Sequence, residues 1–100
     1  MKIKIKGLLS KVGDREGTTP KQFQRIEISM PRFDKWSGEK QGEDIYPGVI
    51  FEKQIEPINA GNFLGMKVEV DGFLNSNEKE VNGKIYRDLY FSAQQITAIP

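Results

Sequence analysis

Met66–Asn75, with the sequence MKVEVDGFLN, alternates between apolar and polar residues, the period of two typical of a half-buried β-strand. Ile85–Ile99, IYRDLYFSAQQITAI, alternates in the same way, with a slip of phase at Gln94 and Gln95. The polar segment between them, Asn75–Lys84, carries an Asn-Gly pair and predicts a hairpin loop. The predicted inward face of the two strands consists of Val68, Val70, Gly72, Leu74, Leu89, Phe91, Ala93, Ile96 and Ile99. This pair of strands predicts part of a closed β-barrel.

Three further strands are predicted upstream of this hairpin. Their expected ranges are Lys2–Val12, Gln22–Met30 and Asp44–Lys53. The first opens as K-I-K-I-K, and the second alternates until Pro31, where we expect it to stop. Loops are expected at Gly13–Lys21 and at Pro31–Glu43, the longest irregular stretch and the one that holds the only Trp.

A short helix is expected between the third and fourth strands. Gln54–Phe63 breaks the alternation, and Ile55 and Ile58 would form one face of the helix, with Pro57 in its first turn. The order of three strands, a helix and two strands is that of the OB barrel, with half of a five-stranded sandwich as the alternative. The residues assigned outright to the core are Phe51, Phe63 and Phe91. The expected fold class is therefore all-β, a five-stranded OB-fold barrel formed by one domain over residues 1–100.

The composition argues against an enzyme. The 100 residues include no His and no Cys, so the usual general base, the commonest metal ligand and all thiol chemistry are missing. We therefore expect no catalysis, no cofactor and no metal site. The net charge is only +1, so nucleic-acid binding would depend on local clusters of Lys and Arg. We find no signal peptide and no apolar run of the ~20 residues that span a bilayer, which predicts a cytoplasmic protein.

Aromatic residues lie beside cations on the predicted outer face and in the loops. Proteins that bind single-stranded nucleic acid use this pairing, because cations neutralise phosphates while rings stack on bases. The candidate binding residues are Phe23, Arg25, Arg32, Phe33, Lys35, Trp36, Lys40, Tyr46, Tyr86 and Arg87. Phe33 and Trp36 stand out because a polar loop rarely builds a core, although packing back onto the barrel is an alternative for them.

Two groups of residues allow more than one interpretation. The outward tyrosines Tyr46, Tyr86 and Tyr90 suit a subunit interface as well as a nucleic-acid surface, since both require amphipathic rings. The lysines at positions 2, 4 and 6 form either a phosphate track or a solvated edge that blocks sheet-to-sheet aggregation, and the second interpretation is slightly favoured.

The sequence resembles the bacterial and phage single-stranded DNA-binding proteins over nearly its whole length. Pro31–Lys53, PRFDKWSGEKQGEDIYPGVIFEK, is similar to the family's second-to-third strand segment, with an aromatic and basic cluster before a hairpin. Phe63–Leu74, FLGMKVEVDGFL, is similar to its Y-L-x-K-G-x-x-V-x-V-x-G-x-L motif. The ending NGKIYRDLYFSAQQITAI matches its closing strand, with Arg87, Ala93 and Ile96 in register. The short, dimeric primosomal replication protein N is also similar, in V-x-V-x-G-F-x-S and A-x-Q-I.

The resemblance implies a protein of DNA replication, repair or recombination that binds single-stranded DNA as a homodimer or homotetramer. It would place Phe33 or Trp36, Tyr46 and Phe51 at base-stacking positions. Pro47 and Gly48 replace positions where the family often carries a basic residue, which lowers the expected affinity. The chain ends at Pro100 without the family's linker and acidic tail, so recruitment of other replication proteins is left open. The alternative is an OB module that binds protein and has no affinity for nucleic acid.

Overall fold

The chain folds into five strands, which contain the alternating segments of the sequence, and one short α-helix. The computed structural model describes all of residues 1–100. The elements are β1 (Lys2–Glu16), β2 (Phe23–Phe33), β3 (Lys40–Phe51), α1 (Glu52–Ile58), a 3-10 turn (Ala60–Phe63), β4 (Lys67–Val81) and β5 (Lys84–Ala98). The α-helix has seven residues, and no helix is long and apolar enough to cross a membrane.

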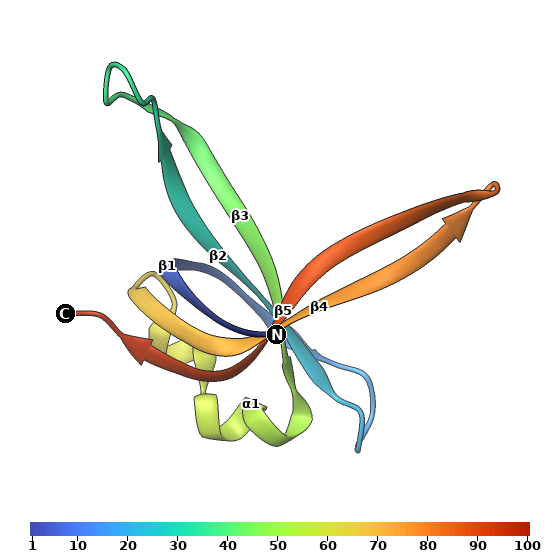
Figure 1. Cartoon of the computed structure of the whole chain (residues 1–100). Helices are drawn as coiled ribbons and strands as arrows, with labels where there is room; N and C mark the ends of the chain where they lie inside the picture. The colour runs from blue at the N-terminus through green and yellow to red at the C-terminus, as the bar shows by residue number, and fades with distance from the viewer.

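The strands close into a barrel in the order β1-β2-β3-β5-β4. Neighbours are antiparallel, except that β3 and β5 meet in a short parallel contact where Gly48 lies opposite Phe91 and Val49 opposite Ser92. The helix α1 connects β3 to β4 and lies at one end of the barrel (Figure 1). This is an OB fold. The predicted fold class is confirmed, and the alternative of half a sandwich is wrong because the sheet is closed.

The core is built from the inward rows of all five strands and closed at one end by α1. It comprises Leu9, Ile26, Ile28, Ile50, Ile55, Ile58, Ala60, Val68, Val70, Phe91, Ala93 and Ile96. Phe63 packs against this cluster, and Ile55 and Ile58 form the buried face of α1, as predicted. Pro57, however, is the sixth residue of α1 and does not lie in its first turn. The helix ends one residue later, before the left-handed Asn59 (φ 49°), so the missing N–H of Pro57 removes only one helical hydrogen bond.

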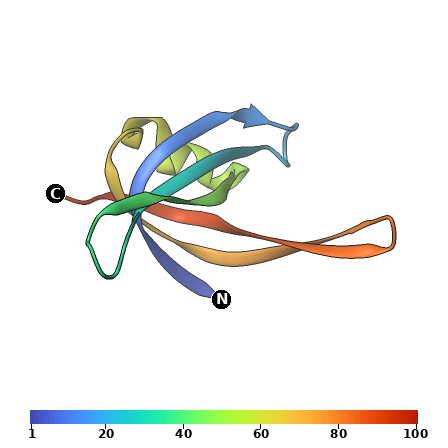
Figure 2. The same cartoon turned by 90° about the horizontal axis from the view of Figure 1, so that it is seen from above.

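Two β-hairpins extend beyond the barrel as arms, both on the side opposite α1 (Figure 1), and they diverge when seen from above (Figure 2). The β2–β3 arm ends in residues 34–39, and the β4–β5 arm ends in Asn82-Gly83. The predicted loop Asn75–Lys84 is therefore largely strand, and the predicted loop Pro31–Glu43 is strand on both sides of the turn at residues 34–39, which corrects both predictions. Both faces of an arm lie in solvent, so its strands lack apolar alternation. The Asn-Gly turn itself is confirmed, with φ of 52° and 77°, the signs that a type I′ turn requires.

The strands run further than the sequence predicts. β1 continues to Glu16, through the first half of the predicted loop, and β3 begins at Lys40. Pro31 lies inside β2, opposite Glu43, and does not end the strand. The pairing of β1 with β2 ends at Ser29, so the next part of β2 has one free edge, where a residue without an N–H is tolerated.

Three residues that the sequence assigns to the interior are exposed. Leu74 and Leu89 continue the inward rows of β4 and β5 past the end of the barrel, where nothing covers them, and are 36% and 61% exposed. Phe51 is 48% exposed because its neighbour Ile50 points into the core and successive residues of a strand face opposite ways. These core assignments were wrong, whereas the assignment of Phe91 is confirmed.

A β-bulge near the end of β5 explains the predicted slip of phase. The register of β4 and β5 shifts between Asp71 and Gly72, which leaves Gln94 without a partner on β4. The extra residue returns Ile96 to the interior, where it is buried. The slip predicted from the sequence is therefore confirmed.

Candidate functional site

A groove of about 390 Å³ lies between the outer face of β2–β3 and the root of the β4–β5 arm. Its lining consists of Phe23, Arg25, Pro47, Gly48, Val49, Phe51, Asn77 and Tyr90. In the β2–β3 ladder Phe23 lies opposite Phe51 and Arg25 lies opposite Val49, and residues two apart share a face. Tyr90 adds a third ring from β5. The groove therefore combines three aromatic rings with one cation on an open surface.

Arg25 is held at the groove by two contacts. Its guanidinium carbon lies 5.7 Å from the centre of the Phe23 ring, within the range of a cation–π interaction. Its Nε lies 3.2 Å from Oε2 of Glu16, at the end of β1. The side chain nevertheless remains exposed, so it can still meet an anion from solvent.

The tip of the β2–β3 arm presents aromatic rings and a free cation. Trp36 is 96% exposed and Phe33 is 56% exposed, so neither packs back onto the barrel. Lys35 is exposed as well, and no carboxylate lies within ion-pair distance of it. These side chains have no contacts that fix them inside the protein and are available to a ligand.

Asp34 organises the turn that carries Trp36. The backbone N–H groups of Trp36 and Ser37 donate to its Oδ1 at 2.6 and 3.0 Å, and Nε2 of Gln41 donates to its Oδ2 at 2.8 Å. The backbone N–H of Asp34 donates to the carbonyl of Glu39 at 2.8 Å. The bonds from Ser37 and Trp36 stabilise the charged carboxylate and lower the pKa of Asp34.

The groove and the tip lie at opposite ends of the same strand face. Phe23 begins β2 at the groove, and Phe33 ends it beside the tip. Ten residues of strand separate them, a distance of about 33 Å at 3.3 Å per residue. No single base could touch both places, but an extended polymer that follows the arm could.

Two predicted site residues face the other side of this arm. Tyr46 lies opposite Ile28, whose side chain is in the core, so Tyr46 belongs to the row that continues from the barrel interior. Arg32 lies in the same row and forms an ion pair with Asp44, with its Nε donating to Oδ1 at 3.1 Å. This pairing raises the pKa of Arg32. The structure does not bring either residue to the groove.

The β4–β5 arm also separates its two predicted residues. Tyr86 shares a row with Tyr90, on the face that lines the groove at the root of the arm. Arg87 lies in the opposite row, and its Nη2 is 2.9 Å from Oε1 of Glu78. Only Tyr86 therefore extends the groove surface along this arm.

Four of the five candidate cations are already paired with carboxylates. The pairs are Arg25 with Glu16, Arg32 with Asp44, Lys40 with Glu43 and Arg87 with Glu78. All eight side chains are largely solvated, so each pair contributes little to stability. A phosphate would have to compete with these carboxylates, and Lys35 is the one candidate without such a competitor.

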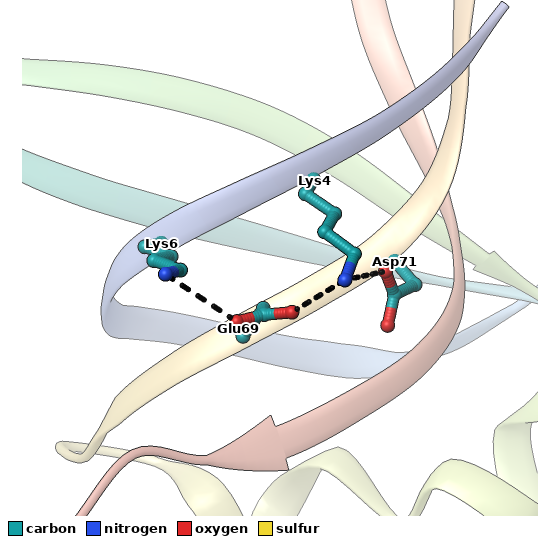
Figure 3. A network of polar contacts seen from close by, with 4 residues as sticks. All are labelled: Lys4, Lys6, Glu69 and Asp71. Carbon is teal, nitrogen blue, oxygen red and sulfur yellow. Dashed lines mark ion pairs between the residues drawn. The ribbon is translucent and has the colours of Figure 1, made fainter.

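A separate ionic network joins β1 to β4 on the other side of the barrel (Figure 3). Nζ of Lys4 lies 3.2 Å from Oε1 of Glu69 and 3.9 Å from Oδ1 of Asp71, and Nζ of Lys6 lies 3.7 Å from Oε2 of Glu69. These contacts raise the pKa of Lys4 and lower that of Glu69. A hollow of about 500 Å³ beside the network is lined by Lys2 and Lys4 as well as by Asp71, so it carries charges of both signs. The pairing weighs against a phosphate track on β1.

Sequence reasoning misses part of the groove. Val49 and Asn77 are not predicted, Tyr90 is left open between a subunit interface and a nucleic-acid surface, and Phe51 is placed in the core although the family resemblance implies a stacking position. The available signal was the phase of β3, because a buried Ile50 between two outward residues gives Phe51 and Val49 the same face as Arg25. The contribution of β4 and β5 follows only from barrel closure. No group of three or more Asp or Glu residues is placed to hold a metal ion.

No protein-family model and no curated protein sequence matches the chain. Solved structures do match it. A mitochondrial single-stranded DNA-binding protein from S. cerevisiae, Rim1, has a TM-score of 0.74 at 17% identity, covering 99% of this chain and 94% of that one. The fold is that of the single-stranded DNA-binding proteins.

Two further structures have the same fold. A single-stranded DNA-binding protein from Plasmodium falciparum, solved with single-stranded DNA, gives a TM-score of 0.69 at 16% identity and covers 98% of this chain and 91% of that one. The dimeric N-terminal domain of PriB from Thermoanaerobacter tencongensis gives a TM-score of 0.62 at 22% identity. The match covers 99% of this chain and 96% of that one. At these identities the likeness establishes the fold, and it confirms at that level the resemblance seen in the sequence.

Proposed function

We propose that the chain is a non-catalytic protein that binds single-stranded DNA without sequence preference. The observation that carries the proposal is the groove lined by Phe23, Phe51 and Tyr90, with Arg25 at its mouth. Open aromatic rings stack on any base, and stacking contributes about 1–3 kcal/mol per base. The β2–β3 face with its adjacent loops is also the surface on which OB folds bind oligonucleotides. The similar structures from yeast and Plasmodium, both single-stranded DNA-binding proteins, support the same ligand.

The strand of DNA would follow the outer face of the β2–β3 arm. Bases stack on the groove rings at one end and on Trp36 at the other, while Arg25 and Lys35 neutralise phosphates near each end. Lys40 lies opposite Phe33 and contributes near the tip if a phosphate replaces Glu43. Arg32 and Tyr46 contribute only if the DNA wraps around the arm, and Tyr86 and Arg87 only if it continues along β4–β5. The protein would act wherever single-stranded DNA is exposed in replication, repair or recombination, in the cytoplasm of a bacterial cell or one infected by a phage.

Self-association is the second part of the proposal. Leu74, Leu89 and Ile85 lie in one row of the β4–β5 arm, which also holds the ion pair of Arg87 with Glu78, and Ile85 is 66% exposed. A second copy of the chain would cover this row, which is consistent with the dimeric PriB domain of the same fold. Sedimentation equilibrium should give a dimer or tetramer, and replacing Leu89 and Ile85 with Ser should shift it towards the monomer. A wild-type monomer at high micromolar concentration would contradict self-association.

The paired cations and the net charge of +1 favour one competing function, an OB module that binds protein instead of DNA. The two functions are separated by titrating the chain with labelled dT oligomers at low and moderate salt, while following the fluorescence of Trp36. DNA binding predicts saturable quenching that weakens with salt. The absence of both quenching and a mobility shift at micromolar protein and low salt would exclude DNA binding.

Variants test whether the proposed rings carry the binding. Phe51→Ala and Trp36→Ala should each weaken dT binding by about tenfold, the effect of losing one stacked base. Because Phe51 is 48% and Trp36 is 96% exposed, the melting temperature should change little. Leu64→Ala is the matched control, since Leu64 is 54% exposed and lies outside the groove. Equal affinities for the control and the ring variants would contradict the proposed contacts.

A further inference from the structure

The β2–β3 tip contains one residue that is not exposed. Every residue between Pro31 and Gln41 is exposed except Asp34, which is half-buried. Its carboxylate receives the three hydrogen bonds described above, two from backbone N–H groups and one from a side chain. The carbonyl of Asp34 accepts a further bond from the N–H of Gly38 at 3.0 Å. A single side chain therefore ties together a turn that has no apolar packing of its own.

These bonds act on the backbone from which Trp36 projects. The indole has almost no contact with the protein, so only the backbone at positions 36 and 37 restricts where it can point. The backbone N–H groups of Trp36 and Ser37 both donate to Oδ1 of Asp34. This local pattern of side-chain to backbone hydrogen bonds fixes the turn. The same bonds lower the pKa of Asp34, and the carboxylate, ionised at neutral pH, is a strong acceptor.

We propose that Asp34 is a positioning residue, which holds the turn so that Trp36 is presented to a base before DNA arrives. The inference rests on the proposed function, because it needs Trp36 to contact DNA. Its energetic basis is preorganisation: a ring presented on an ordered turn loses less conformational freedom on binding than a ring on a mobile loop. A negative charge at a DNA-binding tip is unfavourable for phosphate binding, and the carboxylate of Asp34, unlike that of the exposed Glu39 in the same tip, accepts three hydrogen bonds that offset this cost.

The sign of this charge makes the test decisive. Coulomb repulsion alone predicts that Asp34→Ala tightens DNA binding, because the substitution removes a negative charge near the phosphates. Positioning predicts the opposite, a weakening of about fivefold, comparable to losing one side chain that caps backbone N–H groups. Asp34→Asn removes the same charge but keeps an oxygen that accepts from both backbone N–H groups. Its affinity should stay within about twofold of the wild type or become tighter.

The experiment measures dT affinity for the wild type, Asp34→Ala, Asp34→Asn and Trp36→Ala, together with ¹⁵N relaxation of the free proteins. In the free Asp34→Ala variant, the Trp36 indole and the backbone N–H groups of Trp36 and Ser37 should gain fast motion, while the barrel amides stay rigid. Asp34→Asn should restore both affinity and order. Circular dichroism confirms that each variant is folded.

The outcomes separate the inference from the function. If Trp36→Ala weakens binding but Asp34→Ala binds as tightly as the wild type or more tightly, positioning is wrong and the proposed function stands. Unchanged relaxation at the tip of Asp34→Ala would also overturn positioning, without reference to DNA. If Trp36→Ala leaves the affinity unchanged, the proposed contact of Trp36 with DNA fails, and the inference fails with it.

Discussion

Gly48 is the residue at which the barrel closes. It lies opposite Phe91 in the short parallel contact of β3 with β5, and a Cβ at this position would lie 2.2–2.7 Å from three atoms of the Phe91 ring. Phe91 is a fully buried member of the core, so its ring has no free space to enter. The absence of a side chain at position 48 therefore allows the largest core residue to pack beneath β3.

Gly48→Ala should lower the free energy of unfolding by about 1–3 kcal/mol, the usual cost of overpacking a core. Urea denaturation followed by circular dichroism measures this change. Gly61→Ala is the matched control, because an added Cβ at Gly61 meets no atom within 4 Å. Equal stability of the two variants would show that the contact between Gly48 and Phe91 does not limit packing.

At the scale of single residues, the alternation in the sequence predicts which residues share a strand face. It does not predict where the barrel ends along that face. The alternation correctly places Val68, Val70 and Phe91 inside. It misplaces Leu74 and Leu89, because the same row continues onto an arm that has no opposite wall. The direction of Phe51 could be inferred from the phase of β3, but its proximity to Tyr90 depends on strands that are far apart in sequence.

At the scale of elements, the β4–β5 arm contributes nothing to the core. Every residue from Ser76 to Leu89 is exposed, and the arm is held by its own ladder and the Asn82-Gly83 turn. Deleting residues 78–81 and 84–87 would leave Asn77 and Asp88, which already pair, joined by the same two-residue turn. Four residues removed from each strand preserve both register and face.

The shortened protein should therefore melt within about 4 °C of the wild type, equivalent to less than ~1 kcal/mol for a domain of this size. Thermal unfolding followed by circular dichroism at low protein concentration measures this shift. A deletion of residues 84–87 alone is the comparison, since it removes four residues from one strand only and leaves residues 78–81 without partners. Loss of folding in the symmetric deletion would mean that the arm supports the barrel.

The β1–β4 ion network predicts a defined pH response. Because the pKa of Glu69 is lowered, its stabilising contribution is present above its ordinary value of about 4.3 and is lost as the pH falls through the depressed pKa. Because the pKa of Lys4 is raised, its contribution is present below about 10.4 and is lost as the pH rises through the raised pKa. Between roughly pH 5 and 10 the network should contribute a constant, small amount.

Glu69→Gln should consequently lower the melting temperature slightly at pH 7 and have a smaller effect at acid pH, once the pH has fallen through the depressed pKa of Glu69. The difference should also shrink in 1 M salt, which screens exposed pairs. Melting curves of both proteins across this pH range provide the test. A destabilisation that does not shrink anywhere on the acid side of pH 7 would show that the charge of Glu69 is not what matters.

At the scale of the whole molecule, charge pairing should limit the salt dependence of DNA binding. Five free cations on a single strand would give a slope of log K against log salt of about −3.5. Four of the five candidates already hold carboxylates, so the measured slope should be well short of this value. Affinities for a dT oligomer at several salt concentrations give the slope, and a value at or beyond about −3.5 would contradict the prediction.

Removing one carboxylate should release one cation. Asp44→Asn frees Arg32 and should make binding tighter and the slope steeper, provided that the DNA wraps around the β2–β3 arm. Asp88→Asn removes the same charge from a residue without an ion-pair partner and serves as the control. If the two variants behave alike, the effect is one of net charge and not of the pair.

The overall fold was the most predictable part of the molecule, because local periodicity reveals the strands and the helix in their order along the chain. The candidate site was less predictable. Its tip residues Phe33, Lys35 and Trp36 are adjacent in the sequence and were identified from it, whereas the groove joins β2, β3, β4 and β5. Only closure of the barrel brings those four strands together, and no local pattern reports on it.

The most direct test is to map a dT oligomer onto the protein by ¹H–¹⁵N chemical-shift perturbation. Binding along the β2–β3 face predicts shifts at the Trp36 indole and at the amides of Phe23, Arg25, Phe51 and Tyr90, with Lys4 and Glu69 unaffected. No perturbation at millimolar oligomer, or perturbations centred on the β1–β4 hollow, would contradict the proposed interface.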